Sequence, residues 1–473
     1  MIWEPISELA KKVQKGRITA LSLVEKSLKI IEENAGYHAI LSLTKDRALQ
    51  RAIDIDERII RGETIGRLAG IPFIAKDNFL CFGAETTAAS RILETFNAPY
   101  QSTAINKLEA EGAIVVAKAN LDAFAHGSST ENSAFGPTLN PHDPQKVPGG
   151  SSGGSGASVA LNMVPFALGT DTGGSIRLPA SFCGVVGLKP TYGLVSRYGV
   201  VAMASSTDVI GPLARRVEDA ALVLEVMSGR DIFDGTTIER SKTNYSTLNN
   251  NLKGKIIGVI KEHFTEGIDT DVKKVIESSI ELLSKNGAII KEVSLPSVDL
   301  ALACYYIIVP AEVSSNLSRY DGQRYGLSAN DAKDLNDSYE RARELGFESE
   351  NKRRIMIGTY VLSSGYYDAY YRKAQTVRTK LIEEFENVFK EVDYLVGPTA
   401  PMTAFKLGQN TANPLKMYLA DIMTVAANLA GVPAISIPVG ISQNMPIGLQ
   451  FMAPQCADHE LLDIAYSYQE NAK

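Results

Sequence analysis

Short apolar segments recur along the chain and alternate with segments of helical periodicity. Segments that are apolar at every position, rather than at every second one, are typical of strands buried on both faces of a sheet. The helices that connect such strands cover those two faces. The pattern therefore predicts an α/β fold with a mixed, largely parallel central sheet and helices on both sides. Buried strands are expected at 69–78, 113–117, 164–169, 255–260, 394–397 and 433–438.

The helical segments carry apolar residues three and four positions apart. Two such helices open the chain, and the second follows Ser22. It has Val24, Leu28 and Ile31 on one face and is expected to end near Asn34. Further helices are expected after Ser102 or Thr103, at 157–161, at 272–286 and at 377–389, with an exposed helical excursion at 327–354.

A polar stretch at 229–253, rich in Asn, Ser and Thr, predicts a long surface connection. The chain has 473 residues, enough for two or three average domains or for one large α/β unit. Both sides of the connection have the strand pattern of one sheet, so we expect a single domain over 1–473. Its parts are N-terminal helices at 1–60, a core at about 61–228 and a second α/β part at about 254–473.

Composition narrows the class of protein. The net charge of −6 argues against a protein that binds nucleic acid through a net positive charge of its own. Contact with RNA through a partner stays open. The four cysteines lie far apart without a metal-ligand spacing, which favours reduced thiols and no metal site. The N-terminus lacks the pattern of a signal peptide, and no apolar run of membrane-spanning length is evident. We expect a soluble cytoplasmic protein without a membrane partner.

Two clusters rich in glycine and serine stand out, at 148–162 and at 170–177. Glycine lets backbone N–H groups approach a bound group closely, and serine adds a hydroxyl that a base can activate. A flexible linker is disfavoured, because apolar strand and helix patterns flank both clusters. A phosphate-binding loop is disfavoured too, because Ser155 follows Gly154 where that loop has lysine. The clusters therefore predict a serine-based acyl-transfer site.

The sequence offers no convincing histidine as the base that would activate such a serine. The segment 150–154 matches the Gly-x-Ser-x-Gly turn of hydrolases that use a later acid and then a histidine. Only His263 and His459 follow it in that order, and neither comes after a convincing strand. A serine–histidine–aspartate triad is therefore disfavoured.

Lysine is the remaining base, and Lys76 ends a buried apolar run. Desolvation in such a place lowers the pKa of a lysine, so that the neutral amine becomes available. Two alternatives stay open. Lys76 could form an ion pair with an acid such as Asp77, and Lys118, which also follows a buried strand, is a rival base.

Three segments, 71–77, 149–155 and 171–177, resemble the motifs of the amidase signature family in order and spacing. The resemblance implies the fold of that family and hydrolysis of an amide. It also implies that Ser175 is the nucleophile, Lys76 the base and Ser151 a bridging hydroxyl held by a cis peptide bond. The oxyanion hole would then consist of the backbone N–H groups of Thr172, Gly173, Gly174 and Ser175.

Further segments, at 120–136, 312–322, 362–371 and 418–424, are similar to one branch of that family. Members of the branch release ammonia from glutamine inside tRNA-dependent amidotransferases. The resemblance implies B and C subunits as partners, with ATP and Mg²⁺ used by the partner, tRNA contacted mainly there, and no cofactor in this chain. It also implies that glutamine is held by Ser128, Tyr306, Arg354 and Asp421.

Such a set suits a free amino acid, because arginine matches a carboxylate and aspartate matches an ammonium group. Ordinary surface pairing of Arg354 and Asp421 is the simpler alternative. Two other functions stay open, a stand-alone amidase for small amides and a non-catalytic assembly subunit. Four positions depart from the pattern of the branch: Ala123, His126, Leu178 and Leu194 stand where Glu, Met, Gln and Arg are common.

Overall fold

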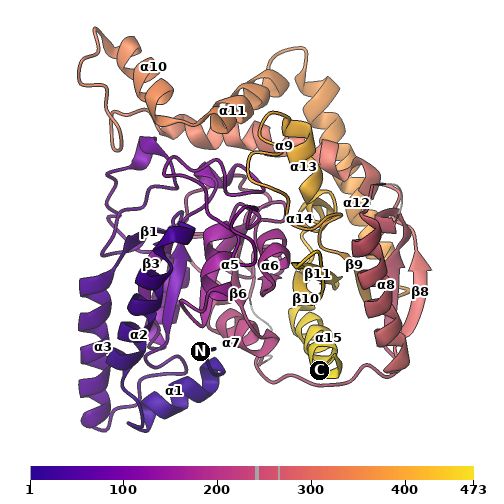
Figure 1. Ribbon diagram of the computed structural model, residues 1–473. Coiled ribbons are helices and arrows are strands. Elements are labelled where there is room, and N and C mark those ends of the chain that lie inside the picture. Colours follow the sequence, from indigo (N-terminus) through magenta and orange to yellow (C-terminus); the bar gives the residue numbers. More distant parts are fainter. Residues whose placement is uncertain (1, 240–243, 265–266, 473) are drawn as a thin grey trace.

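The computed structural model describes residues 2–239, 244–264 and 267–472 (Figure 1). Within these residues, eleven strands form one sheet in the order β1-β3-β2-β4-β6-β5-β10-β11-β9-β7-β8. The strands are β1 (Ile40–Leu43), β2 (Pro72–Lys76), β3 (Ile114–Ala119), β4 (Phe166–Asp171), β5 (Val186–Lys189), β6 (Val209–Ala214), β7 (Ile256–Ile260), β8 (Ile289–Val293), β9 (Tyr394–Pro398), β10 (Ala434–Ser442) and β11 (Met445–Met452).

The sheet is mixed. Parallel pairing joins β3, β2 and β4 in one block and β8, β7 and β9 in another. Antiparallel pairing joins β1 to β3 and connects the strands between the two blocks. Strands from both sides of the polar stretch 229–253 belong to this one sheet. The predicted α/β class and mixed sheet are confirmed. The expectation that the sheet is largely parallel is not met, because six of its ten strand pairings are antiparallel.

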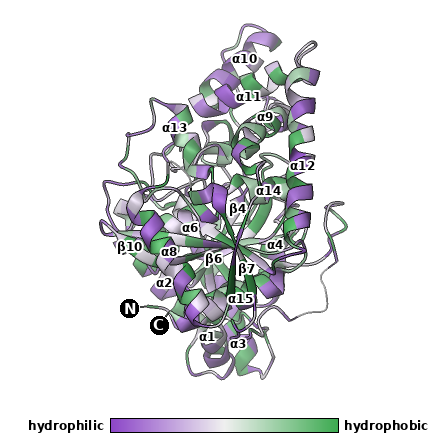
Figure 2. Cartoon of the chain, turned by 90° about the vertical axis from the view of Figure 1, so that its right-hand side faces the viewer, coloured by the Kyte–Doolittle hydropathy of each residue, from purple (hydrophilic) through white to green (hydrophobic). Residues whose placement is uncertain are grey.

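Helices cover the sheet on both faces. Helix α5 packs against α6, whereas α7 packs against both α4 and α15, so these helices belong to separate layers. Helices α9, α10 and α11 lie at the end of the molecule away from the two termini (Figures 1 and 2). The helices are α1 (Ile6–Gln14), α2 (Ala20–Glu33), α3 (Lys45–Ile60), α4 (Thr103–Ala110), α5 (Gly153–Ala160), α6 (Arg177–Cys183), α7 (Val217–Met227), α8 (Thr270–Lys285), α9 (Val298–Asn316), α10 (Leu335–Gly346), α11 (Ser349–Leu362), α12 (Lys373–Val388), α13 (Pro414–Tyr418), α14 (Val425–Ala430) and α15 (Asp458–Asn471).

Each of the six predicted strands is present, with boundaries shifted by a few residues. The helix predicted after Ser22 begins at Ala20, because the Thr19 side chain accepts a hydrogen bond from the Ser22 N–H and caps it. Ser102, rather than Thr103, caps α4. The helix predicted at 157–161 begins earlier, at Gly153, inside the glycine- and serine-rich cluster.

The apolar pattern missed β1, β5, β6, β8 and β11. In β6 and β11, glycine and proline interrupt the apolar run, and both residues are usually unfavourable inside a strand. These strands form because neighbours on both sides supply hydrogen bonds and burial. In β8, four of the five residues are exposed or half-buried, so no apolar run marks it.

Two expectations about the helical part are wrong. The segment 327–354 is only partly an exposed excursion, because Glu350, Asn351 and Arg354 at the start of α11 are buried. One segment of the described chain, Val298–Arg319, is long and apolar enough to cross a membrane by length and composition, although no such run was expected. Half of it is buried inside the protein, and its helix α9 packs against α11 and α12. Its apolar composition is that of a core helix.

Candidate active site

Lys76 lies at the carboxyl end of strand β2, in the interior of the protein. The strand is buried along its whole length, and the Lys76 side chain at its carboxyl end is fully buried. Its Nζ donates hydrogen bonds to Ser151 Oγ at 2.8 Å, Ser152 Oγ at 2.9 Å and Thr170 Oγ1 at 2.9 Å. The lysine therefore joins the first glycine- and serine-rich cluster to the end of β4.

Burial lowers the pKa of Lys76 to about 7, although the negative charges of Asp122, Asp171 and Asp208 oppose that shift. Asp77, the acid proposed as its ion-pair partner, instead accepts a hydrogen bond from Lys118 Nζ at 2.7 Å. Lys118 is therefore held in a buried ion pair, which makes it the poorer candidate for a base. Lys76 has hydroxyl partners and no recorded ion pair within the described chain.

The two glycine- and serine-rich clusters meet at Ser152 and Ser175. The peptide bond between Gly150 and Ser151 is cis, as the family resemblance implies. The Ser152 N–H donates to the Ser175 carbonyl at 3.1 Å, which ties the clusters together. The Ser175 side chain has no hydrogen-bond partner in the described part of the chain and remains slightly exposed, at 8%. A substrate can therefore reach Ser175, whereas Ser151 and Lys76 are fully buried.

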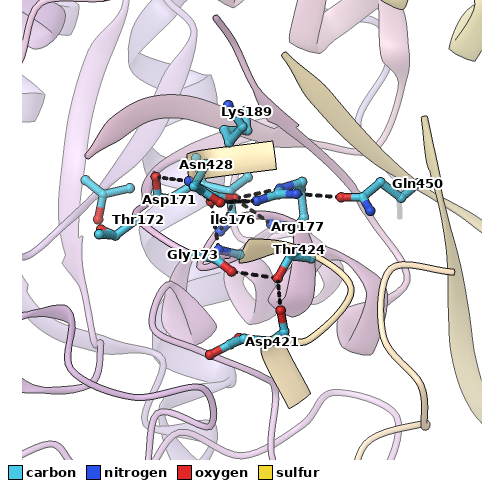
Figure 3. Close-up of polar contacts among 12 residues, drawn as sticks. Asp171, Thr172, Gly173, Ile176, Arg177, Lys189, Asp421, Thr424, Asn428 and Gln450 are labelled. Carbon is cyan, nitrogen blue, oxygen red and sulfur yellow. Dashed lines mark hydrogen bonds and ion pairs between the residues drawn. The ribbon is translucent and has the colours of Figure 1, made fainter. Parts of the chain in front are cut away.

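Asp171 organises the loop that carries Ser175 (Figure 3). Its carboxylate accepts hydrogen bonds from the backbone N–H groups of Gly174 and Ile176, at 2.8 and 3.2 Å. The guanidinium of Arg177 adds two more, both at 3.0 Å, and is itself fully buried. Burial opposes ionisation of Asp171, but the charge and hydrogen bonds of Arg177 outweigh it and hold the pKa at about 2. The loop is thus fixed around a buried anion.

The contacts of Gly174 correct one part of the predicted oxyanion hole. Its N–H points to Asp171 and is not free for a substrate oxygen, which leaves the N–H groups of Thr172, Gly173 and Ser175 as candidates. Gly174 has φ of +138°, and a Cβ there would lie 2.2 Å from Thr424 Oγ1. The Thr424 hydroxyl in turn donates to the Gly173 carbonyl at 2.6 Å. Only glycine fits this close approach.

The four predicted substrate-binding residues lie together. The Ser128 hydroxyl donates to the Asp421 carboxylate, and Asp421 belongs to the short helix η7 (Leu419–Asp421). Arg354 on α11 lies over the rings of Tyr306 and Tyr418, at 5.3 and 5.7 Å from their centroids. Arg354 and Asp421 are both buried, at 2% and 7% exposure. Surface pairing, the simpler alternative for these two residues, is therefore wrong.

The electrostatics of this group suit an amino acid. Burial raises the pKa of Asp421 to about 7, against the opposing hydrogen bond of Ser128 and charge of Arg354. Arg354 Nε donates to Glu350 at 2.9 Å, and Tyr418 donates to the same carboxylate at 2.8 Å. The Tyr306 hydroxyl is buried and has no partner in the described chain. A buried hydroxyl without a partner is costly, so a ligand that accepts or donates there would be favoured.

Comparison with known proteins places the chain in a family. A model of the Amidase family matches residues 22–462. The chain belongs to that family. The A subunit of glutamyl-tRNA(Gln) amidotransferase from Thermosynechococcus vestitus is 51% identical to it over 468 residues, covering 98% of this chain and 97% of the relative. The protein of the same name from Trichormus variabilis is 52% identical over 472 residues, with 98% and 97% covered.

A solved structure of a relative has the same fold as this chain. The crystal structure of the glutamyl-tRNA(Gln) amidotransferase A subunit from Thermotoga maritima matches this amidase with a TM-score of 0.80 and 42% identity, covering 96% of this chain and 92% of the other. A serine–serine–lysine triad is typical of the amidase family. Lys76, Ser151 and Ser175 are the candidates for it in this amidase.

Several residues of the site had no clear signal in the sequence. Glu350, Asn428 and Gln450 are ordinary polar residues in helices or strands, and only the fold brings them to Arg354 or to the Asp171 loop. Ser152 is not among the predicted site residues, yet its hydroxyl contacts Lys76. Its position beside Ser151 was the signal available.

One departure from the family branch, Leu194, lies in the main core of this amidase. Leu178 lies beside the site, because its N–H donates to the Gly174 carbonyl at 2.8 Å and its buried cluster contains Tyr418. Ala123 and His126 instead lie against α11, where the Asn351 side chain contacts both. In the described residues, no group of three or more His, Cys, Asp and Glu side chains is arranged to hold a metal ion.

Proposed function

We propose that this chain is the glutaminase component, the A subunit, of a glutamyl-tRNA(Gln) amidotransferase. The observation that carries the proposal is the contact between buried Lys76 and Ser151, in a cluster whose next residue, Ser152, is hydrogen-bonded to the slightly exposed Ser175. The names and full-length similarity of the relatives support the same conclusion. The segments outside the catalytic clusters that resemble the amidotransferase branch add further support.

The reaction begins with proton transfer. The neutral amine of Lys76 accepts the proton of Ser151, which accepts the proton of Ser175 as the Ser175 oxygen attacks the side-chain amide carbon of glutamine. The pKa of about 7 makes the neutral amine available near neutral pH. The oxygen of the tetrahedral intermediate is stabilised by N–H groups of the loop, for which Thr172, Gly173 and Ser175 are the candidates.

The same relay then runs in reverse. The proton on Lys76 returns through Ser151 to the amide nitrogen, the C–N bond breaks, and ammonia leaves. Ser175 now carries the γ-glutamyl group as an ester. Water attacks that ester after losing a proton to the relay, which gives glutamate and restores the Ser175 hydroxyl.

The substrate is held by charge at its amino acid end. Arg354 binds the α-carboxylate, and Asp421, oriented by Ser128, binds the α-ammonium group. Tyr306 contributes its unpartnered hydroxyl. Thr424 links Asp421 to the loop of Ser175, because its hydroxyl contacts the Asp421 and Gly173 carbonyls. We therefore expect the amide end of a glutamine held at Asp421 to point toward Ser175.

The ammonia is used by a partner. In this proposal a B subunit, with a C subunit, converts Glu-tRNA(Gln) to Gln-tRNA(Gln) with ATP and Mg²⁺, and it makes most of the contacts to tRNA. The net charge of −6 and the Ser155 in place of a phosphate-loop lysine support leaving both roles to the partner. We expect the complex to work in the cytoplasm, where translation takes place.

The test is Ser175→Ala in the reconstituted complex, assayed with glutamine and then with an ammonium salt. We expect loss of the glutamine-dependent reaction and retention of the ammonium-dependent one, because the variant removes only the source of ammonia. Loss of both would contradict the proposal. High activity of the isolated chain on simple amides without glutamine turnover would instead favour a stand-alone amidase. Failure to trap an acyl-enzyme from glutamine with hydroxylamine would favour an assembly subunit without catalysis.

A further inference from the structure

His126 and Asn351 form a buried polar pair beside the proposed glutamine site. His126 follows the short helix η3 (Ala123–Ala125), and Asn351 lies in the first turn of α11. Their side chains are 0% and 1% exposed. The Asn351 amide nitrogen contacts His126 Nδ1 at 2.7 Å and the Ala123 carbonyl at 2.9 Å.

These contacts determine where the proton of His126 lies. The Ala123 carbonyl can only accept, so the contacting Asn351 atom is the amide nitrogen. Its two N–H groups are then used by that carbonyl and by His126 Nδ1. Nδ1 must accept, which places the proton of a neutral imidazole on Nε2. Burial, together with the charge of Arg354, keeps the pKa of His126 well below its usual range, in agreement with a neutral ring.

The pair leaves two polar atoms without partners. His126 Nε2, a donor, and Asn351 Oδ1, an acceptor, are both buried and unpaired in the described chain. Buried polar atoms in native proteins are rarely left unpaired, because each costs free energy. The neighbouring groups belong to the proposed glutamine site. Arg354 lies one helical turn after Asn351, and Ser128, which binds Asp421, lies two residues after His126.

We propose that His126 is a specificity-determining residue whose Nε2–H donates a hydrogen bond to the α-carboxylate that Arg354 binds. Asn351 is a positioning residue, because it holds the ring in the tautomer that donates. The inference rests on the proposed function, in which glutamine is the substrate. It goes beyond that function because it adds a neutral hydrogen-bond donor, His126, to the charged groups that are proposed to hold the substrate.

The carboxylate is the matching group for chemical reasons. A neutral donor beside a guanidinium attracts an oxygen anion, and a carboxylate has enough lone pairs to accept from both. Glutamine without its α-carboxylate, 4-aminobutanamide, has the same amide and amino groups and no such acceptor. The two compounds therefore separate a contact to the carboxylate from any general effect on the pocket.

The experiment measures KM and kcat of the assembled enzyme for L-glutamine in the wild type, His126→Met and His126→Gln. Binding of L-glutamine and of 4-aminobutanamide is measured by calorimetry on the same three chains in a Ser175→Ala background. For His126→Met we expect KM and the dissociation constant for L-glutamine to rise about tenfold, the usual effect of one hydrogen bond to a charged group. We expect kcat to stay within about twofold, because the contact is equal in ground and transition states.

Comparisons between the two compounds and between the variants test whether His126 contacts the carboxylate. Binding of 4-aminobutanamide should be the same in wild type and His126→Met, and His126→Gln, which keeps an N–H donor, should recover most of the L-glutamine affinity. His459→Met, on α15 with its ring against the Thr247 carbonyl, is the control for the substitution itself. Equal weakening for both compounds, or a lower melting temperature with unchanged L-glutamine affinity, would overturn the inference and leave the proposed function intact. A wild-type complex that neither binds nor hydrolyses L-glutamine would overturn both.

Discussion

Lys76 Nζ lies 2.8 Å from Ser151 Oγ, although 75 positions separate the two residues in the chain. The contact joins the end of strand β2 to the turn before helix α5, where the Gly150–Ser151 bond is cis. Because the lysine is desolvated and has hydroxyl partners, it can be neutral and accept a proton near pH 7.

The first prediction concerns pH. kcat for glutamine should rise with pH up to about 7 and then level off, because burial lowers the pKa of Lys76 and only the neutral amine accepts the Ser151 proton. Lys76→Arg should lower kcat by about 10²–10⁴ and abolish this rise, since arginine stays charged. Steady-state rates between about pH 5.5 and about pH 9, a range that lies on both sides of that pKa, give the profile.

Lys189 supplies the control, because burial lowers its pKa to about 7 as well, while its Nζ contacts only the Pro190 carbonyl among recorded hydrogen bonds of the described chain. Lys189→Met should keep the midpoint of the profile. A midpoint that disappears with Lys189 and persists in Lys76→Arg would contradict the assignment of the base.

The second prediction compares two neighbouring serines that both contact Lys76. Ser151→Ala should lower kcat by about 10²–10⁴, because it removes the hydroxyl that relays the proton. Ser152→Ala should lower kcat by less than about tenfold, because Ser152 helps to hold the lysine, as does Thr170. Pre-steady-state measurement of ammonia release on both variants tests the difference. Equal losses would show that the two hydroxyls share the relay.

The third prediction concerns Asp421. KM of the wild type for glutamine should fall as pH rises through about 7, because burial raises the pKa of this carboxyl and only the ionised form attracts the ammonium group. Asp421→Asn should raise KM by roughly 10–100-fold and remove that pH dependence. KM measured across the same pH range, together with kcat, provides the test. A fall in kcat with unchanged KM would instead place Asp421 in the chemical step.

The fourth prediction concerns stability. Arg177→Met leaves the buried Asp171 carboxylate without its cation and should lower the free energy of unfolding by about 3–5 kcal/mol. Arg372→Met, which removes an exposed ion pair with Asp368, should change it by about 0–1 kcal/mol. Urea denaturation of the two variants at neutral pH provides the comparison. Similar small effects would mean that the Asp171 loop is held by other contacts.

The same pair has a dependence on acid. The pKa of Asp171 is lowered to about 2, below its ordinary value near about 3.9, so its ionised form contributes stability above pH ~4. That contribution is lost as pH falls from about 4 to about 2. In the wild type the free energy of unfolding should therefore fall over that pH range. Asp171→Asn should make it less dependent on pH there.

Much of the fold follows from local pattern. Six strands were predictable, because burial on both faces requires apolar residues at every strand position. Helices α2, α8 and α12 were predictable from apolar residues three and four positions apart, whereas α7, α9 and α15 were not predicted. Strands β6 and β11 were not predictable, since glycine and proline interrupt them and only their neighbours in the sheet stabilise them. The start of α5 was missed for a similar reason, because a run of glycine and serine has little helical preference of its own.

The sequence by itself determined the kind of chemistry. Two glycine- and serine-rich clusters next to buried strands predict an activated serine, and Lys76 at the end of an apolar run predicts a lysine base. Only the tertiary structure decided between the lysines, because Lys118 meets Asp77 whereas Lys76 meets Ser151. It also decided that Arg354 and Asn351 are buried and that Gly174 donates to Asp171. The reason is physical. Burial, ion pairing and hydrogen-bond direction depend on which segments, distant in the sequence, come into contact, and local periodicity does not specify those contacts.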